Sequence, residues 1–97
     1  MEDVTMFIER EAGIVRALLK RKVADTVDKE VIMKFEGVLS RLESKALTVD
    51  DLETVRSLVK AKLKASQWVL EKGKSDKPET LKEYIEGLEL VMSKFKE

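Results

Sequence analysis

Three polar side chains fall inside stretches whose apolar residues recur at helical spacing, and these residues are the best placed for chemistry. Glu11 lies at the centre of the first apolar stripe, and Lys62 and Ser66 interrupt a later one. A carboxylate and an amine enclosed by apolar side chains can bind a small polar ligand or exchange protons with it. Alternatively, Glu11 and Lys62 lie at stripe edges, extend to solvent or form an ion pair that sets helix register. No further polar side chain converges on the same layer, so a small helical enzyme or ligand-binding bundle ranks third among our hypotheses.

The amino-acid composition removes most common catalytic chemistry. The chain of 97 residues contains no Cys and no His, which excludes disulfide scaffolds, thiol nucleophiles, imidazole bases and the usual zinc sites. Acidic residues between Glu9 and Glu36 recur at spacings that could hold Mg²⁺, but they project largely outward or lie in a turn. We therefore expect a protein that is not an enzyme and that holds neither a metal ion nor another cofactor.

Charge is segregated along a chain that is neutral overall, with 19 basic and 19 acidic side chains. The stretch from Arg56 to Lys77 holds seven basic residues against two acidic ones, a local excess of +5. Arg56, Lys60 and Lys64 recur every four residues on one exposed helix face. Gln67 continues that side, and such a face could contact phosphates. A nucleic-acid-associated accessory or regulatory protein is our second hypothesis, although the chain shows no recognised nucleic-acid-binding motif.

A large aromatic side chain among small ones supports a protein-binding function. Trp68 lies well off the apolar stripe of its helix, on a side that it shares with Ala61 and Ala65. Leu90 likewise lies off the apolar seam of the last helix. An exposed tryptophan rimmed by small residues is typical of a binding hot spot, although the ring could instead cap one end of a helical bundle. Our first hypothesis is a small non-enzymatic interaction or adaptor module that binds another protein or itself, as a homodimer.

Apolar periodicity and capping residues predict the helices that position these side chains. Four helices are expected, at residues 3–23, 26–46, 49–72 and 78–96. The first boundary depends on a rotation of the apolar face by roughly 160° near Asp25 and Thr26, either of which can cap a new helix. The later boundaries carry stronger signals, which are a capping Thr48, a helix-ending Gly73, and Pro78 in a first turn.

Four amphipathic helices joined by short connections must fold back on their neighbours. This predicts an all-α, up-down-up-down antiparallel four-helix bundle that forms one domain over residues 1–97. No apolar run is long enough to span a membrane, and the first residues carry acids where a secretory signal carries positive charge. We therefore expect a cytoplasmic protein without a membrane partner.

Overall fold

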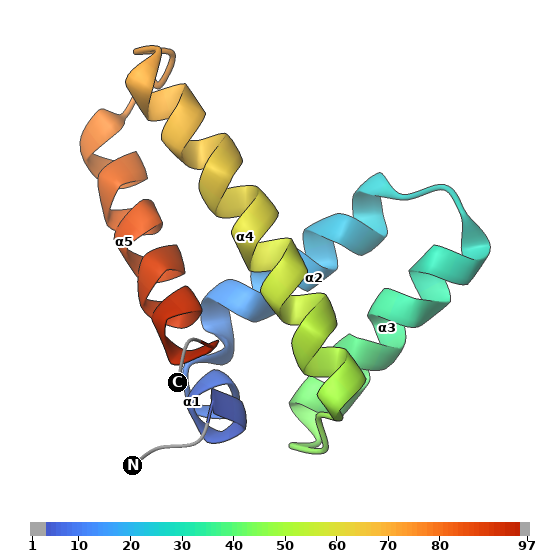
Figure 1. Ribbon diagram of the computed structural model, residues 1–97. Helices are drawn as coiled ribbons and strands as arrows, with labels where there is room; N and C mark the ends of the chain where they lie inside the picture. Colours follow the sequence, from blue (N-terminus) through green and yellow to red (C-terminus); the bar gives the residue numbers. More distant parts are fainter. Residues whose placement is uncertain (1–3, 96–97) are drawn as a thin grey trace. The chain divides into compact units, whose positions relative to one another are not determined.

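The chain folds into helices, with no strand among the residues described. The computed structural model describes residues 4–95, apart from the side chain of Ala12. Its helices are α1 (Val4–Arg10), α2 (Ala12–Asp25), α3 (Lys29–Glu43), α4 (Val49–Glu71) and α5 (Pro78–Phe95) (Figure 1). The prediction of an all-α protein is confirmed, but the described residues form five helices where four were predicted. The predicted helix ends at Asp3 and Lys96 lie outside the described residues.

The chain divides into two compact units within α4. The first unit runs to Val55 and the second begins at Arg56. Because α4 is one helix, it contributes its first turns to the first unit and its remainder to the second. The single domain over residues 1–97 stays a prediction. Across residues 4–95, no helix combines the length and the apolar character needed to cross a membrane.

The first predicted helix is broken at Glu11, which lies between α1 and α2. The Glu11 backbone leaves the helical region, with φ −102° and ψ 44°, although its N–H still donates to the Phe7 carbonyl at 2.8 Å. In an unbroken helix, the Glu11 carboxylate would lie at the centre of a buried stripe, where an unpaired charge is costly. The break leaves Glu11 exposed, and Gly13 lowers the helix propensity of the following turn. The prediction of one helix over residues 3–23 is therefore wrong.

The first unit contains α2 and α3, which pack against each other after a short connection. Asp28 caps α3, because its Oδ1 accepts hydrogen bonds from the N–H groups of Glu30 (2.9 Å) and Val31 (3.3 Å). A turn is present where the apolar face rotates, as predicted. However, α2 includes Asp25, so the cap is Asp28 rather than Asp25 or Thr26.

Apolar side chains from both helices are buried in this unit. They are Val15, Leu18 and Leu19 of α2 and Val38 and Leu42 of α3. Burial of each large side chain contributes roughly 1.5–3 kcal/mol. The guanidinium of Arg16 in α2 also pairs with the carboxylate of Glu43 in α3. This helix pair holds the last turn of α3 in place, from which the chain leads into α4.

The second unit consists of the rest of α4 and of α5, which runs in the opposite direction (Figure 1). α4 ends in a Schellman motif around Gly73, which has φ +63° and donates its N–H to Leu70 O at 3.2 Å. The following N–H, of Lys74, donates to Val69 O at 3.1 Å. Pro78 is the first residue of α5, so both predicted boundaries are confirmed. The buried side chains of this unit include Val59, Ser66, Ile85, Leu88 and Val91.

Candidate interaction surface

One line of side chains faces outward along α4. Lys60, Lys64 and Trp68 follow each other every four residues, and Ala61 and Ala65 flank them. All five residues are exposed, and they lie on the side of α4 opposite to its buried face. We call Lys60, Ala61, Lys64, Ala65 and Trp68 the α4 outer ridge.

The ring of Trp68 is held at the surface. Half of the residue, 50%, is exposed, and the neighbouring Ala61 and Ala65 are too small to cover it. The Lys74 ammonium lies 5.0 Å from the centroid of the ring, which is a cation–π contact. The Schellman motif turns the chain back over the last turn of α4 and so brings Lys74 to the ring. Trp68 therefore lies beside the α4–α5 connection with part of its surface exposed.

Leu90 is exposed, as predicted, but it does not join Trp68 in one patch. It lies on α5 and is 52% exposed. With a rise of about 1.5 Å per residue, Leu90 is about 18 Å along α5 from Pro78, whereas Trp68 is about 4.5 Å from the last residue of α4. Because the two helices run in opposite directions from their connection, these side chains lie toward opposite ends of the unit. The predicted partner-binding set of Trp68, Ala61, Ala65 and Leu90 thus separates into two surfaces.

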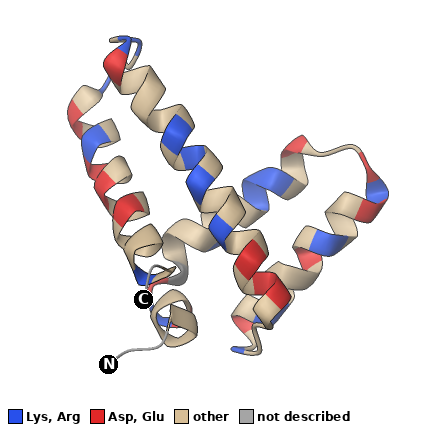
Figure 2. Ribbon diagram, in the orientation of Figure 1, with Lys and Arg blue, Asp and Glu red and all other residues tan. Residues whose placement is uncertain are grey.

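Basic side chains occupy the middle of α4 (Figure 2). Between residues 54 and 70, the helix carries four basic residues and no acidic one. Arg56, Lys60 and Lys64 are exposed, whereas Gln67 is half-buried. The acidic residues of α4 are confined to its two ends, so the outer face of its middle turns presents a positive band.

The polar residues predicted inside apolar stripes have different surroundings. Ser66 is buried and Lys62 is half-buried, and both continue the line of Val59 along α4. Glu11 lies at the surface, with its side chain 57% exposed and its Oε1 3.3 Å from Nε of Arg10. The prediction of a buried Glu11 is wrong because the helix break carries the residue out of the stripe. An exposed carboxylate cannot supply the enclosed acid that a site around Glu11 and Lys62 requires.

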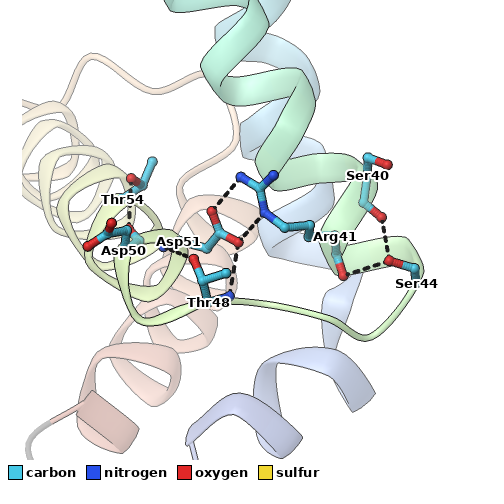
Figure 3. A network of polar contacts seen from close by, with 7 residues as sticks. All are labelled: Ser40, Arg41, Ser44, Thr48, Asp50, Asp51 and Thr54. Carbon is cyan, nitrogen blue, oxygen red and sulfur yellow. Dashed lines mark hydrogen bonds and ion pairs between the residues drawn. The ribbon is translucent and has the colours of Figure 1, made fainter.

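A polar cluster that the sequence did not indicate lies at the corner between α3 and α4 (Figure 3). Arg41 donates from Nε and Nη2 to the two carboxylate oxygens of Asp51, at 2.6 and 2.8 Å. Asp51 Oδ2 also accepts from the backbone N–H of Thr48 at 3.0 Å. In return, the Thr48 hydroxyl oxygen accepts from the Asp51 N–H at 3.1 Å. This reciprocal pair is a capping box at the start of α4, which confirms Thr48 as the predicted cap.

Asp51 is buried although it is charged. Its side chain is 4% exposed, whereas that of Arg41 is 42% exposed. The hydrogen bonds from Arg41 hold the pKa of the Asp51 carboxyl below its usual range, and they outweigh burial, which acts to raise it. Hydrogen bonding to Thr48 lowers this pKa further. The Asp51 carboxylate is therefore ionised and shielded from water, and its hydrogen bonds join α3 to α4.

An open groove of about 380 Å³ lies beside this cluster, between α3 and the first turns of α4. Met33, Arg41 and Thr54 are among its lining residues. A Cβ at Gly37 would lie 3.3 Å from the terminal nitrogens of Arg41, so glycine lets the guanidinium approach α3 closely. Within residues 4–95, no three acidic side chains gather in a way that could hold a metal ion. The ion pair of the corner thus forms part of the lining of the groove.

Comparisons with protein-family models, with curated proteins and with solved structures gave no match. The surfaces of the molecule therefore have to indicate its function. Of these surfaces, the α4 outer ridge presents an exposed tryptophan ring beside small side chains, and tryptophan is enriched among binding hot spots.

Proposed function

We propose that the protein is a small non-enzymatic interaction module that binds another polypeptide through the α4 outer ridge. The observation that carries this proposal is the half-exposed ring of Trp68, held at the surface beside Ala61 and Ala65. Tryptophan is enriched among binding hot spots, because covering its ring removes a large apolar area from water at a small entropic cost. The neighbouring alanines allow a partner helix to approach closely.

The bound polypeptide in this proposal is another protein or a second copy of the chain, in which case we expect a homodimer. Lys60 and Lys64 precede the ring on the same face of α4 and favour a partner with acidic side chains at matching positions. We further propose that the module acts in the cytoplasm and that its helices close into the up-down-up-down bundle predicted from the sequence.

A photoreactive amino acid at Ala65 tests this proposal. When the full chain is irradiated, in purified form and in the cells that produce it, we expect a covalent adduct with a polypeptide because position 65 lies inside the covered surface. The matched control carries the same amino acid at Ala24, an exposed alanine of α2. Equal yields at the two positions, or no adduct at position 65, contradict the proposal.

The positive band on α4 favours one alternative, a nucleic-acid-associated accessory or regulatory protein. In this alternative, Arg56, Lys60 and Lys64 contact phosphates and Trp68 stacks on an unpaired base. Salt-dependent binding of a single-stranded oligonucleotide, weakened by Lys60→Glu combined with Lys64→Glu, supports it. A lack of binding at low ionic strength removes it.

A further inference from the structure

α5 carries an outward line of its own, whose charge is opposite to that of α4. Glu79, Glu83, Glu86 and Leu90 follow each other at intervals of three or four residues, and all four are exposed. They lie on the side of α5 opposite to its buried face, and acidic residues are prominent along this helix (Figure 2). We call these four residues the α5 outer ridge.

The two ridges match position by position when the helices are laid parallel. The matched pairs are Lys60 with Glu83, Lys64 with Glu86, and Trp68 with Leu90. At a rise of about 1.5 Å per residue, the three α4 positions span about 12 Å and the three α5 positions about 10.5 Å. The two spans are similar, so all three pairs can form at once. Each basic side chain then faces an acidic one, and the aromatic ring faces the exposed leucine.

The opposite alignment is less favourable. When the helices are antiparallel and both Lys–Glu pairs are kept, with Lys60 opposite Glu86 and Lys64 opposite Glu83, the Trp68 ring faces the carboxylate of Glu79. Leu90 is then left facing Arg56. Both apolar groups then lie against charged groups, whose hydration is partly lost without an apolar contact in return. The sequence of charges and apolar residues therefore selects the parallel alignment.

A parallel match is possible only between two copies of the chain. Within one chain, α4 and α5 run in opposite directions (Figure 1). Among the described residues, no ion pair is recorded for the four charged side chains in question, which are Lys60, Lys64, Glu83 and Glu86. These charges are thus available to a partner molecule.

We propose that the occupant of the α4 outer ridge is the α5 outer ridge of a second copy of this chain. This inference rests on the proposed function and names the partner for that surface. Its centre is the Trp68–Leu90 contact, and the two ion pairs form a polar rim on one side. Because the two ridges are different surfaces, the contact is heterologous, so the homodimer forms first and larger assemblies follow as concentration rises. Exposed ion pairs contribute little each, so the contact is weak and weakens further with added salt.

Reversing the charge of each ridge, separately and then together, tests this contact by sedimentation velocity. Lys60→Glu combined with Lys64→Glu makes the α4 outer ridge acidic, and Glu83→Lys combined with Glu86→Lys makes the α5 outer ridge basic. Each variant alone places like charges across the contact, so we expect it to need at least about tenfold higher concentration than wild type to associate. An equimolar mixture of the two variants restores opposite charges and is expected to associate like wild type.

A matched control separates this contact from an effect of net charge. Lys20→Glu combined with Lys29→Glu lowers the net charge by the same amount as the α4 variant, at exposed positions of α2 and α3, and is expected to leave association unchanged. Circular dichroism checks that every variant keeps its helical content.

The remaining outcomes distinguish this inference from the proposed function. A wild-type chain that stays monomeric up to about 1 mM, variants that associate like wild type, or a mixture that fails to re-associate each overturn the inference. If position 65 then forms an adduct with a different protein, the proposed function stands without a second copy as partner. If association appears only after an oligonucleotide is added, the inference is also overturned and the nucleic-acid alternative is favoured.

Discussion

At its first turn α4 is tied to α3 by a buried carboxylate, whereas at its last turn it is closed by backbone hydrogen bonds. Asp51 accepts two hydrogen bonds from Arg41 and a third from the Thr48 N–H. At the other end, the motif around Gly73 provides hydrogen bonds to carbonyl groups in the last turn of the helix, and Trp68 remains half exposed. Side chains that close a helix end have their hydrogen-bonding groups occupied within the fold. An end that is closed by its backbone leaves its side chains available for recognition.

The helices that lead into the two connections end in the same backbone motif but with different residues. After α3, the Lys45 N–H donates to Leu42 O at 3.2 Å and the Ala46 N–H donates to Arg41 O at 2.8 Å. Lys45 has φ +58°, in the left-handed region where Gly73 lies after α4. A side chain in that region costs about 1 kcal/mol or more. The α3–α4 corner therefore carries backbone strain, which the Asp51 cluster offsets. The α4–α5 connection carries no such strain, because glycine occupies its left-handed position.

The largest effect that this comparison predicts is at Asp51. Asp51→Ala removes the partner of Arg41 and half of the capping box, so we expect the free energy of unfolding to fall by about 2–3 kcal/mol. Urea denaturation followed by circular dichroism measures the loss. Asp50→Ala is the control, because this exposed neighbour adds only a favourable interaction with the helix dipole, worth about 0.5 kcal/mol. Equal losses in the two variants would mean that the cluster does not hold the corner.

The same cluster predicts how stability depends on pH. The pKa of Asp51 is lowered in the folded chain, so its contribution is complete above the ordinary carboxyl pKa of about 4 and is lost as pH falls through the lower, folded-state value. We expect the stability difference between wild type and Asp51→Asn to be constant near neutral pH and to shrink below about pH 4. Denaturation of both proteins over a pH series measures this difference. A difference that stays constant into the acid range contradicts the assignment.

Exchanging residues at the two left-handed positions is expected to shift stability in opposite directions. Gly73→Ala places a side chain at φ +63° in otherwise open space, so it measures backbone strain alone, about 1 kcal/mol of destabilisation. Lys45→Gly relieves strain, but it also adds freedom to the unfolded chain, which leaves a gain of roughly 0.5 kcal/mol. Thermal and urea denaturation measure both changes. A neutral Gly73→Ala would show that the α4 end does not depend on this backbone conformation.

The smallest predicted effect is on the contact between Lys74 and Trp68. Lys74→Gln removes an exposed cation–π interaction, so we expect a stability loss of about 0.5 kcal/mol and a change in tryptophan emission. The chain contains one tryptophan, so its fluorescence reports this site alone. Lys77→Gln, in the same connection, serves as the control and is expected to leave the emission unchanged. Identical spectra for Lys74→Gln and wild type contradict the contact.

Sequence reasoning located α4 and α5 closely, because strong local signals mark their ends. The predictions of residues 49–72 and 78–96 compare with helices at Val49–Glu71 and Pro78–Phe95. Thr48, Gly73 and Pro78 each act within one turn of chain, so no knowledge of the tertiary structure is needed. The exposure of Trp68 was likewise predictable from its angle around α4 relative to the apolar stripe.

The first half of the chain and the corner cluster were less predictable, because tertiary contacts decide them. The predicted helix at residues 26–46 is longer at both ends than α3 (Lys29–Glu43), whose cap is Asp28. Judged by periodicity alone, Glu11 is a minor interruption of an apolar stripe. Burying its charge is costly enough, however, to favour a break in the helix at this residue. The Arg41–Asp51 pair depends on how the corner brings the last turn of α3 onto the first turn of α4, which no pattern within either helix records.

The interruption at Glu11 has a consequence for how the chain opens. It leaves α1 only seven residues long, too short to persist as an isolated helix in water. α1 is therefore retained through its two buried side chains, Phe7 and Ile8. Its detachment exposes those two anchors and the surface that they cover, which is only part of the core, so it requires less free energy than unfolding of the whole chain. One acidic residue in mid-stripe thus converts part of a long rod into a segment that can come away independently.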